Sequence, residues 1–164
     1  MAGLSEFLYH RFDTQVADKG LYIVDIDVVP HAKSYNITFY VDKPGSTISL
    51  DECELVSRMV SAALDEDAEF DTLTKGYHYV LEVSSPGLNK TLKNARELKY
   101  FKGRRVEMKL KTPIHKDYHV VADLVETKAT GEVVSSLTVK LKDKDETIEI
   151  DWKEIKLIKL FFEV

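Results

Sequence analysis

The first apolar positions of the chain recur at helical spacing, and the next ones alternate. Between Leu4 and Val16 an apolar side chain returns every third or fourth residue, and Gly20 follows as a stop signal, so the pattern predicts a helix. Residues 21–29 and 35–42 alternate apolar and polar side chains, which indicates two strands with one buried face each. In the first strand we expect one face to carry Tyr22, Val24, Ile26 and Val28, and the other to carry Asp25 and Asp27.

The second predicted helix has the clearest start in the chain. Ser49 and Glu52 fit a capping box, in which each side chain accepts a hydrogen bond from the other residue's backbone N–H. An apolar stripe from Cys53 to Leu64 follows, and the acidic run after it is interpreted as a helix exit on a solvated face. Residues 77–83 alternate again and predict a third strand. The order of these elements predicts an α/β sandwich with two helices on a three-stranded sheet.

The second half of the chain has a different pattern of apolar and polar residues. A short helical segment at 94–101 is followed by short alternating runs, which turn-forming residues break at regular spacing. This pattern favours a small antiparallel β-barrel or sandwich, and the last run, 155–164, fits a final strand that closes it. The fold class is therefore α+β. We expect an N-terminal domain over residues 1–90 and a C-terminal domain over residues 91–164.

The formal net charge of −5 hides a division along the chain. Residues 1–92 hold 7 basic and 15 acidic residues, whereas residues 93–164 hold 16 and 13. A patch for a phosphate backbone is one interpretation of the basic excess, and a solvated linker and strand face is the other. Between residues 90 and 116 only Glu97 and Glu107 are acidic, and the basic residues are Lys90, Lys93, Arg96, Lys99, Lys102, Arg104, Arg105, Lys109, Lys111 and Lys116.

Several classes of protein are disfavoured by composition. No apolar run approaches the roughly 20 residues that span a bilayer, and the N-terminus lacks the basic and then apolar order of a secretory signal. The single cysteine, Cys53, excludes an internal disulfide framework. We therefore expect a soluble cytoplasmic protein that does not act at a membrane.

The sequence contains no complete motif for catalysis or metal binding among those tested below. The stretch VSSPG lacks the glycine spacing of a nucleophile elbow, and no Walker A or dinucleotide-binding pattern occurs. His115 and His119 stand in a loop-to-strand region, where their spacing does not bring two rings to one face. The acidic run from Asp65 lacks the glycine and the glutamate of a calcium loop. Trp152 is interpreted as a core or barrel-rim residue rather than a stacking platform, although stacking stays open.

The stretch LEVSSPGLNKTL, residues 81–92, is the least ordinary in the chain. Proline disfavours helix for the residue before it, and Gly87 can then reverse the chain. The two serines are left to hold the turn or to meet an anion, and a hydrolase that uses Ser84 or Ser85 would need a base that is not nearby in sequence. The stretch predicts a rigid strand exit that presents a polar, partly basic loop.

These residues resemble a known family. LEVSSPG is similar to the signature of the ribosome maturation factor RimP family, in which Leu, an acid, Arg, Pro and Leu usually follow. Residues 40–65, with their D-K-P-G turn and L-D-E-C helix start, resemble that family's second characteristic stretch. The resemblance implies an N-terminal α/β domain with two helices on a three-stranded sheet, then an Sm- or SH3-like barrel. One departure is that Lys90 stands where the family usually carries arginine, so a forked contact is lost while the charge is kept.

The resemblance also implies a function without catalysis or cofactor. The protein is expected to bind the immature small (30S) ribosomal subunit of bacteria transiently, as a monomer without a small-molecule substrate. Our own hypothesis is that the acidic half faces a basic ribosomal protein while the basic segment faces rRNA. A protein-only adaptor, which grips a ribosomal protein or peptide through the barrel, is the alternative. The expected contacts to the particle are Ser84, Ser85, Pro86, Gly87 and Lys90 in the shaped loop, and Lys99, Lys102, Arg104 and Arg105 as electrostatic contacts.

Overall fold

The computed structural model describes residues 2–162 and divides at Pro86 into two compact units. We call them the N-terminal unit, through Pro86, and the C-terminal unit, from Gly87 onward. Each is described by itself. Within residues 2–162, every helix falls short of the length and apolar character that crossing a membrane requires.

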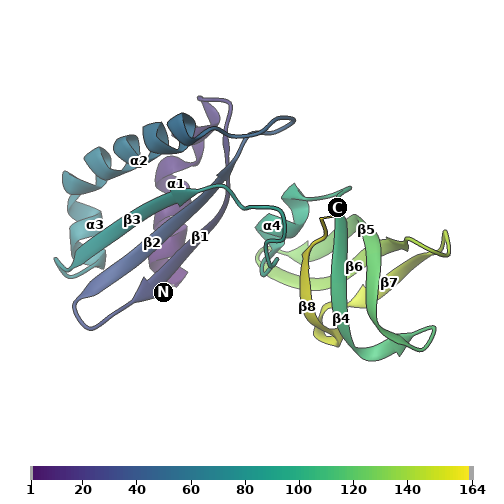
Figure 1. The fold of residues 1–164 in the computed structure, drawn as a ribbon. Helices are drawn as coiled ribbons and strands as arrows, with labels where there is room; N and C mark the ends of the chain where they lie inside the picture. The colour runs from purple at the N-terminus through teal and green to yellow at the C-terminus, as the bar shows by residue number, and fades with distance from the viewer. Residues whose placement is uncertain (1, 163–164) are drawn as a thin grey trace. The chain divides into compact units, whose positions relative to one another are not determined.

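The N-terminal unit is a three-stranded sheet with helices (Figure 1). The strands lie in the order β1-β2-β3, with β1 and β2 antiparallel and β2 and β3 parallel. A parallel pair needs a crossover between its strands, and α2 and α3 supply it. Along the chain the elements are α1 (Ala2–Ala17), β1 (Tyr22–Pro30), β2 (Ser34–Asp42), α2 (Leu50–Asp65), α3 (Ala68–Leu73) and β3 (His78–Ser84).

One core joins the helices to a single face of this sheet. The side chains of Leu4, Leu8, Phe12 and Val16 in α1 are buried, and the stripe of α2 packs in the same cluster. The rings of Phe12 and Phe39 meet edge to face, with their centroids 6.0 Å apart. The helical periodicity of α1 and α2 and the alternation along β2 are therefore confirmed as buried faces of this unit.

The predicted faces of β1 are wrong in its first half. A β-bulge between Ile23 and Asp25 inserts an extra residue, so Ile23 and Ile26 both join the core with the helices. Asp25 is only 2% exposed, rather than on a polar face. Its Oδ1 accepts a hydrogen bond from the Tyr9 hydroxyl at 3.4 Å, and that hydroxyl accepts one from the Ile26 N–H at 2.8 Å.

The capping box of α2 is confirmed. The Ser49 Oγ accepts from the Glu52 N–H at 3.1 Å, and the Glu52 Oε1 accepts from the Ser49 N–H at 3.0 Å. The acidic run after α2 is not only an exit, because it contains the short helix α3. Asp67 caps α3 by accepting from the Phe70 N–H at 2.9 Å, and Phe70 is buried.

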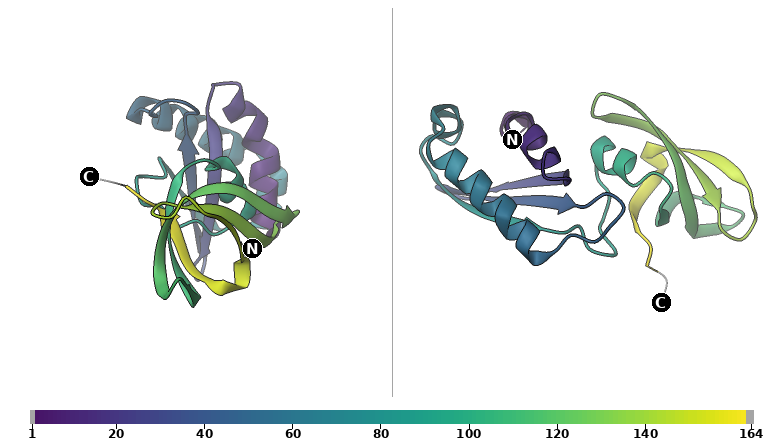
Figure 2. Two further views of the ribbon diagram at one scale, coloured as in Figure 1. Left: turned by 90° about the vertical axis from the view of Figure 1, so that its right-hand side faces the viewer. Right: turned by 90° about the horizontal axis from the view of Figure 1, so that it is seen from above.

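The C-terminal unit is an antiparallel sheet that curls strongly, as the two views of Figure 2 show. Its strands lie in the order β7-β6-β5-β4-β8, so the last strand returns beside the first. The helix α4 adds Leu98 to the buried core. The elements are α4 (Ala95–Tyr100), β4 (Arg105–Ile114), β5 (Asp117–Thr130), β6 (Val133–Leu141), β7 (Thr147–Asp151), a 3-10 turn (Trp152–Glu154) and β8 (Ile155–Leu160).

The closure predicted for this sheet is not seen in its hydrogen bonds. Within residues 2–162, β7 and β8 are the two edges, and no ladder joins them. The edge of β8 instead pairs with the segment before α4. The Leu92 N–H donates to the Ile158 carbonyl and the Leu160 N–H donates to the Lys90 carbonyl, each at 2.9 Å. The end of the predicted final strand, residues 163 and 164, lies outside the described residues.

Candidate functional site

The serines stand at the end of β3, where the N-terminal unit ends. Ser84 is the last residue of the strand and is half-buried, whereas Ser85 is exposed. The Ser84 Oγ donates to the Ser85 carbonyl at 3.1 Å. This hydroxyl is therefore engaged with the backbone of the strand exit, next to the half-buried Pro86.

Gly87 opens the C-terminal unit with a φ of +79°, a conformation that strains residues with a Cβ. Leu88 and Asn89 follow and are exposed. The chain bends at Leu88 and Asn89, directly after this glycine. This bend directs the next residues along β8, where Thr91 bridges to Lys159.

Lys90 is turned into its own unit. Its ammonium pairs with the carboxylate of Glu97, and the two side chains are only 8% and 0% exposed. The other oxygen of Glu97 accepts from the Lys93 N–H at 3.0 Å, and the Glu97 N–H donates to Asn94 Oδ1 at 2.9 Å, so Glu97 also completes the cap of α4. The structure thus places the Lys90 charge in an internal ion pair, away from the exposed loop that the sequence predicted for it.

The last turn of α4 and the connection to β4 carry three basic residues, Lys99, Lys102 and Arg104, which we call the basic turn. All three side chains are exposed. The backbone of this turn is fixed to β5, because the Gly103 N–H donates to the Leu124 carbonyl at 2.6 Å and the Leu124 N–H donates to the Arg104 carbonyl at 2.9 Å. The turn therefore presents three cations from a rigid backbone.

Arg105, the fourth predicted electrostatic contact, is only half-exposed. Its Nε lies 3.1 Å from Asp123 Oδ1, and Asp123 is its register partner across β4 and β5. The structure therefore brings three of the predicted cations to one turn and pairs the other two, Lys90 and Arg105, within the unit. Their partners Glu97 and Asp123 were missed. The N-x-x-E pattern of Asn94 and Glu97 is a capping signal that the sequence did carry.

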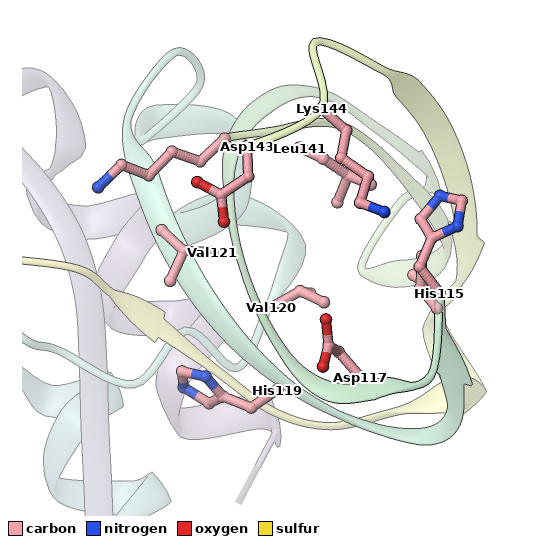
Figure 3. Close-up of a pocket in the computed structure, with 10 residues that line it drawn as sticks. His115, Asp117, His119, Val120, Val121, Leu141, Asp143 and Lys144 are labelled. Carbon is pink, nitrogen blue, oxygen red and sulfur yellow. The ribbon is translucent and has the colours of Figure 1, made fainter.

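Beside the β4–β5 hairpin lies a groove of about 280 Å³ (Figure 3). Its two histidines contact different carboxylates. The His115 Nε2 lies 2.7 Å from Glu146 Oε2, and the His119 Nε2 lies 2.9 Å from Glu107 Oε2. In Figure 3 the two rings lie apart, at different ends of the groove. The hairpin turn itself has positive φ at both His115 and Lys116, 50° and 73°.

Glu107 joins three strands on the outer face of this sheet. Its carboxylate contacts His119 from β5 and, at 3.1 Å, the Nζ of Lys159 from β8. Burial alone would raise the pKa of Glu107, but the hydrogen bonds and charges of Lys159 and His119 outweigh it and hold the pKa below its ordinary value. This carboxylate thus pairs with the ammonium of Lys159, which would otherwise extend the basic surface.

The N-terminal unit has an acidic groove of about 370 Å³ at the start of α3. Its carboxylates lie beside aromatic rings, and Phe70 and Tyr79 meet edge to face at 5.3 Å. The Tyr79 hydroxyl donates to Asp65 Oδ1 at 2.7 Å. Burial, together with the neighbouring Asp65, raises the pKa of Tyr79. The phenol therefore stays protonated and keeps its hydrogen bond to Asp65 in the lining of the groove. The charged lining residues are Asp65, Glu66, Asp67 and Asp71.

Fold and site together define a class of protein: an α/β unit followed by a curled antiparallel sheet, with oppositely charged surfaces as its candidate sites. Residues 12–89 match the family model described as the RimP N-terminal domain. Residues 12–89 therefore carry an N-terminal domain of the RimP family, a family of ribosome maturation factors. The match contains the whole of residues 40–65 and most of LEVSSPGLNKTL, so the resemblance is confirmed where it was seen.

Proposed function

We propose that this protein is a non-enzymatic assembly factor for the small ribosomal subunit. It binds the immature 30S particle transiently in the cytoplasm, stabilises a near-native arrangement of rRNA and ribosomal protein, and leaves once that site is mature. Binding energy alone can do this, because a ligand shifts an equilibrium by its differential affinity for two states. The class of the family, ribosome maturation, supports the assignment.

The observation that carries the proposal is the rigid basic turn. Lys99, Lys102 and Arg104 project from a backbone that two hydrogen bonds fix to β5. Exposed cations on a fixed backbone contact phosphates without the entropic cost of ordering that backbone, and they release counterions when they do so. Lys90 and Arg105 contribute less to this contact in our proposal, because Glu97 and Asp123 already pair with them.

The N-terminal unit suits a different component of the particle. Through Pro86 the chain has 6 basic and 15 acidic residues, and its groove at α3 collects four of these carboxylates. Such a surface repels an RNA backbone and attracts a basic ribosomal protein. We therefore propose that this unit faces protein while the C-terminal unit faces rRNA.

The proposal includes the finer architecture of the C-terminal unit. The return of β8 beside β4, the 3-10 turn before it and the curl of the sheet support a small barrel of the Sm or SH3 type. We further propose that the two units are independent domains and that the factor acts as a monomer.

Sedimentation of a cell extract tests this function. The protein should travel with immature small subunits and be depleted from mature subunits and from the free pool. Equal occupancy of mature and immature subunits, or absence from both, would contradict the proposal. Ribonuclease treatment of the isolated complex distinguishes the protein-only adaptor, because an adaptor stays bound to purified ribosomal protein after the rRNA is removed.

A further inference from the structure

The only tryptophan of the chain, Trp152, opens the 3-10 turn between β7 and β8. Its side chain is half-buried rather than part of the core. It lines a shallow groove of about 250 Å³ along the β8 edge of the sheet. This is less than the roughly 300–1,000 Å³ of a small-molecule pocket, so the groove suits one flat group of a longer chain.

The lining of this groove combines apolar side chains with two lysines. Leucine and isoleucine side chains from β8 and from the segment before α4 form the floor, and Lys93 and Lys156 stand among them. The described lining residues include no carboxylate. The full lining is Thr91, Leu92, Lys93, Trp152, Ile155, Lys156, Leu157 and Ile158.

Two polar groups at the groove make no polar contact to other described residues. Among residues 2–162, the Trp152 indole N–H has no hydrogen-bond acceptor and the Lys156 ammonium has no carboxylate partner. Buried indole N–H groups usually find an acceptor. Here both donors stay available to a ligand, which should therefore be rich in acceptors and negatively charged.

We propose that this groove binds an unpaired base of single-stranded RNA, with the base against Trp152 and the flanking phosphates at Lys156 and Lys93. Proteins hold unpaired bases by stacking them on aromatic rings and neutralising the backbone with basic side chains. The absence of lining carboxylates disfavours a basic peptide at the same place. This inference deepens the proposed function and rests on it for the source of the RNA, the rRNA of an immature particle.

The internal ion pair has a positioning role in this site. The Lys90 carbonyl and the Leu92 N–H tie the segment before α4 to β8, and Glu97 accepts from the Lys93 N–H. Glu97 is held in turn by the Lys90 ammonium. The pair therefore fixes the wall of the groove that carries Lys93, although neither of its charges faces the RNA.

The intrinsic fluorescence of Trp152 reports directly on this groove, because the sequence has no other tryptophan. Titration with a short unstructured RNA should quench this fluorescence, and the same sequence as a duplex should not. In anisotropy measurements with labelled RNA, Trp152→Ala should weaken binding about 5- to 150-fold, the loss of one stacked base. Trp152→Phe should keep most of the affinity and controls for folding. Lys156→Ala should reduce the salt slope of binding by about one.

Lys140→Ala is the matched control, because Lys140 is an exposed lysine of the same unit that pairs with Asp145 at 2.8 Å. Unchanged fluorescence with single-stranded RNA, equal quenching by the duplex, or native affinity in folded Trp152→Ala would each overturn the inference. If any of these occurs while the protein still sediments with immature subunits, the inference fails and the proposed function stands. If RNA binds through Trp152 but the protein is absent from immature subunits, the proposed function fails and the base site stands.

Discussion

The two units differ in the sign of their excess charge and in which of their charged side chains are paired. Through Pro86, where 15 acidic residues oppose 6 basic ones, the carboxylates of Glu52 and Asp67 cap helices and many others stay on the surface. From Gly87 onward, where 17 basic residues oppose 13 acidic ones, carboxylates such as those of Glu97, Glu107 and Asp123 pair with cations within the unit. The net charge of a segment therefore does not show which of its charges are available. In the C-terminal unit pairing engages Lys90 and Arg105, whereas the three cations of the basic turn stay exposed.

If each unit is stabilised by its own core, a large deletion in one core should destabilise that unit alone. Phe39→Ala removes a fully buried ring from the N-terminal unit, which should cost about 3–5 kcal/mol of its unfolding free energy. Far-UV circular dichroism in urea should show this unit unfolding earlier. The fluorescence of Trp152, which reports only the C-terminal unit, should keep its midpoint. Parallel shifts in both signals would contradict independent units, and Val80→Ala, at a site 62% exposed, is the mild control.

The internal ion pair gives the corresponding prediction for the C-terminal unit. Lys90→Met leaves the Glu97 carboxylate buried without its cation, which should cost about 3–5 kcal/mol. The Trp152 fluorescence transition in urea measures this loss. Adding Glu97→Gln should recover part of it, because the second change removes the unpaired charge. Lys128→Met, at an exposed pair with Glu149, should change the midpoint little. An equally small effect of Lys90→Met would show that Lys90 is free for an external contact.

Whether a feature could be predicted from the sequence depends on how far apart in sequence its interacting residues lie. The capping box at Ser49 and Glu52 was predictable because both partners lie within one turn of helix. The bulge before Asp25 was not, because an extra residue in β1 is defined only by its register against β2. The pairing of Arg105 with Asp123 likewise depends on the register of β4 and β5 across their hairpin.

The candidate site was predictable as a region and not as a set of contacts. Counting charges located the basic segment, and the exposed turn lies within it. The number of charged residues does not show that the Glu97 carboxylate lies inside the unit beside the Lys90 ammonium. The groove at Trp152 joins residues about 60 apart in sequence, so no local pattern revealed it.

The helix cap tests whether carboxylates stabilise the N-terminal unit locally. Ser49→Ala removes the acceptor of the Glu52 N–H, which should cost about 1 kcal/mol of unfolding free energy. Ser49→Asp keeps an acceptor and should restore most of the loss. Urea denaturation followed by circular dichroism measures both changes. Equal stability of all three proteins would mean that the cap contributes nothing.

The smallest expected effect concerns the pH dependence of stability that arises from the contacts of Glu107 with His119 and Lys159. Because its folded-state pKa lies below its ordinary value of 4.5, this carboxylate stabilises the fold above that pH and loses the contribution as pH falls through the lower, folded pKa. The contribution of a partly exposed pair should stay below about 1 kcal/mol. Glu107→Gln should remove this part of the acid dependence of the Trp152 transition. An unaltered acid dependence in that variant would assign it to other carboxylates.

The central claim is that the basic turn makes the electrostatic contact with the immature small subunit. Its most direct test is the binding of full-length protein to purified immature subunits over a range of salt concentrations, with Lys99, Lys102 and Arg104 replaced by glutamate. Each lost phosphate contact should reduce the salt slope by about one, so the account predicts weaker binding and a slope lower by about three. The control changes three exposed lysines of the same unit, Lys128, Lys140 and Lys144, in the same way. Unchanged affinity and slope in the basic-turn variant would contradict the account.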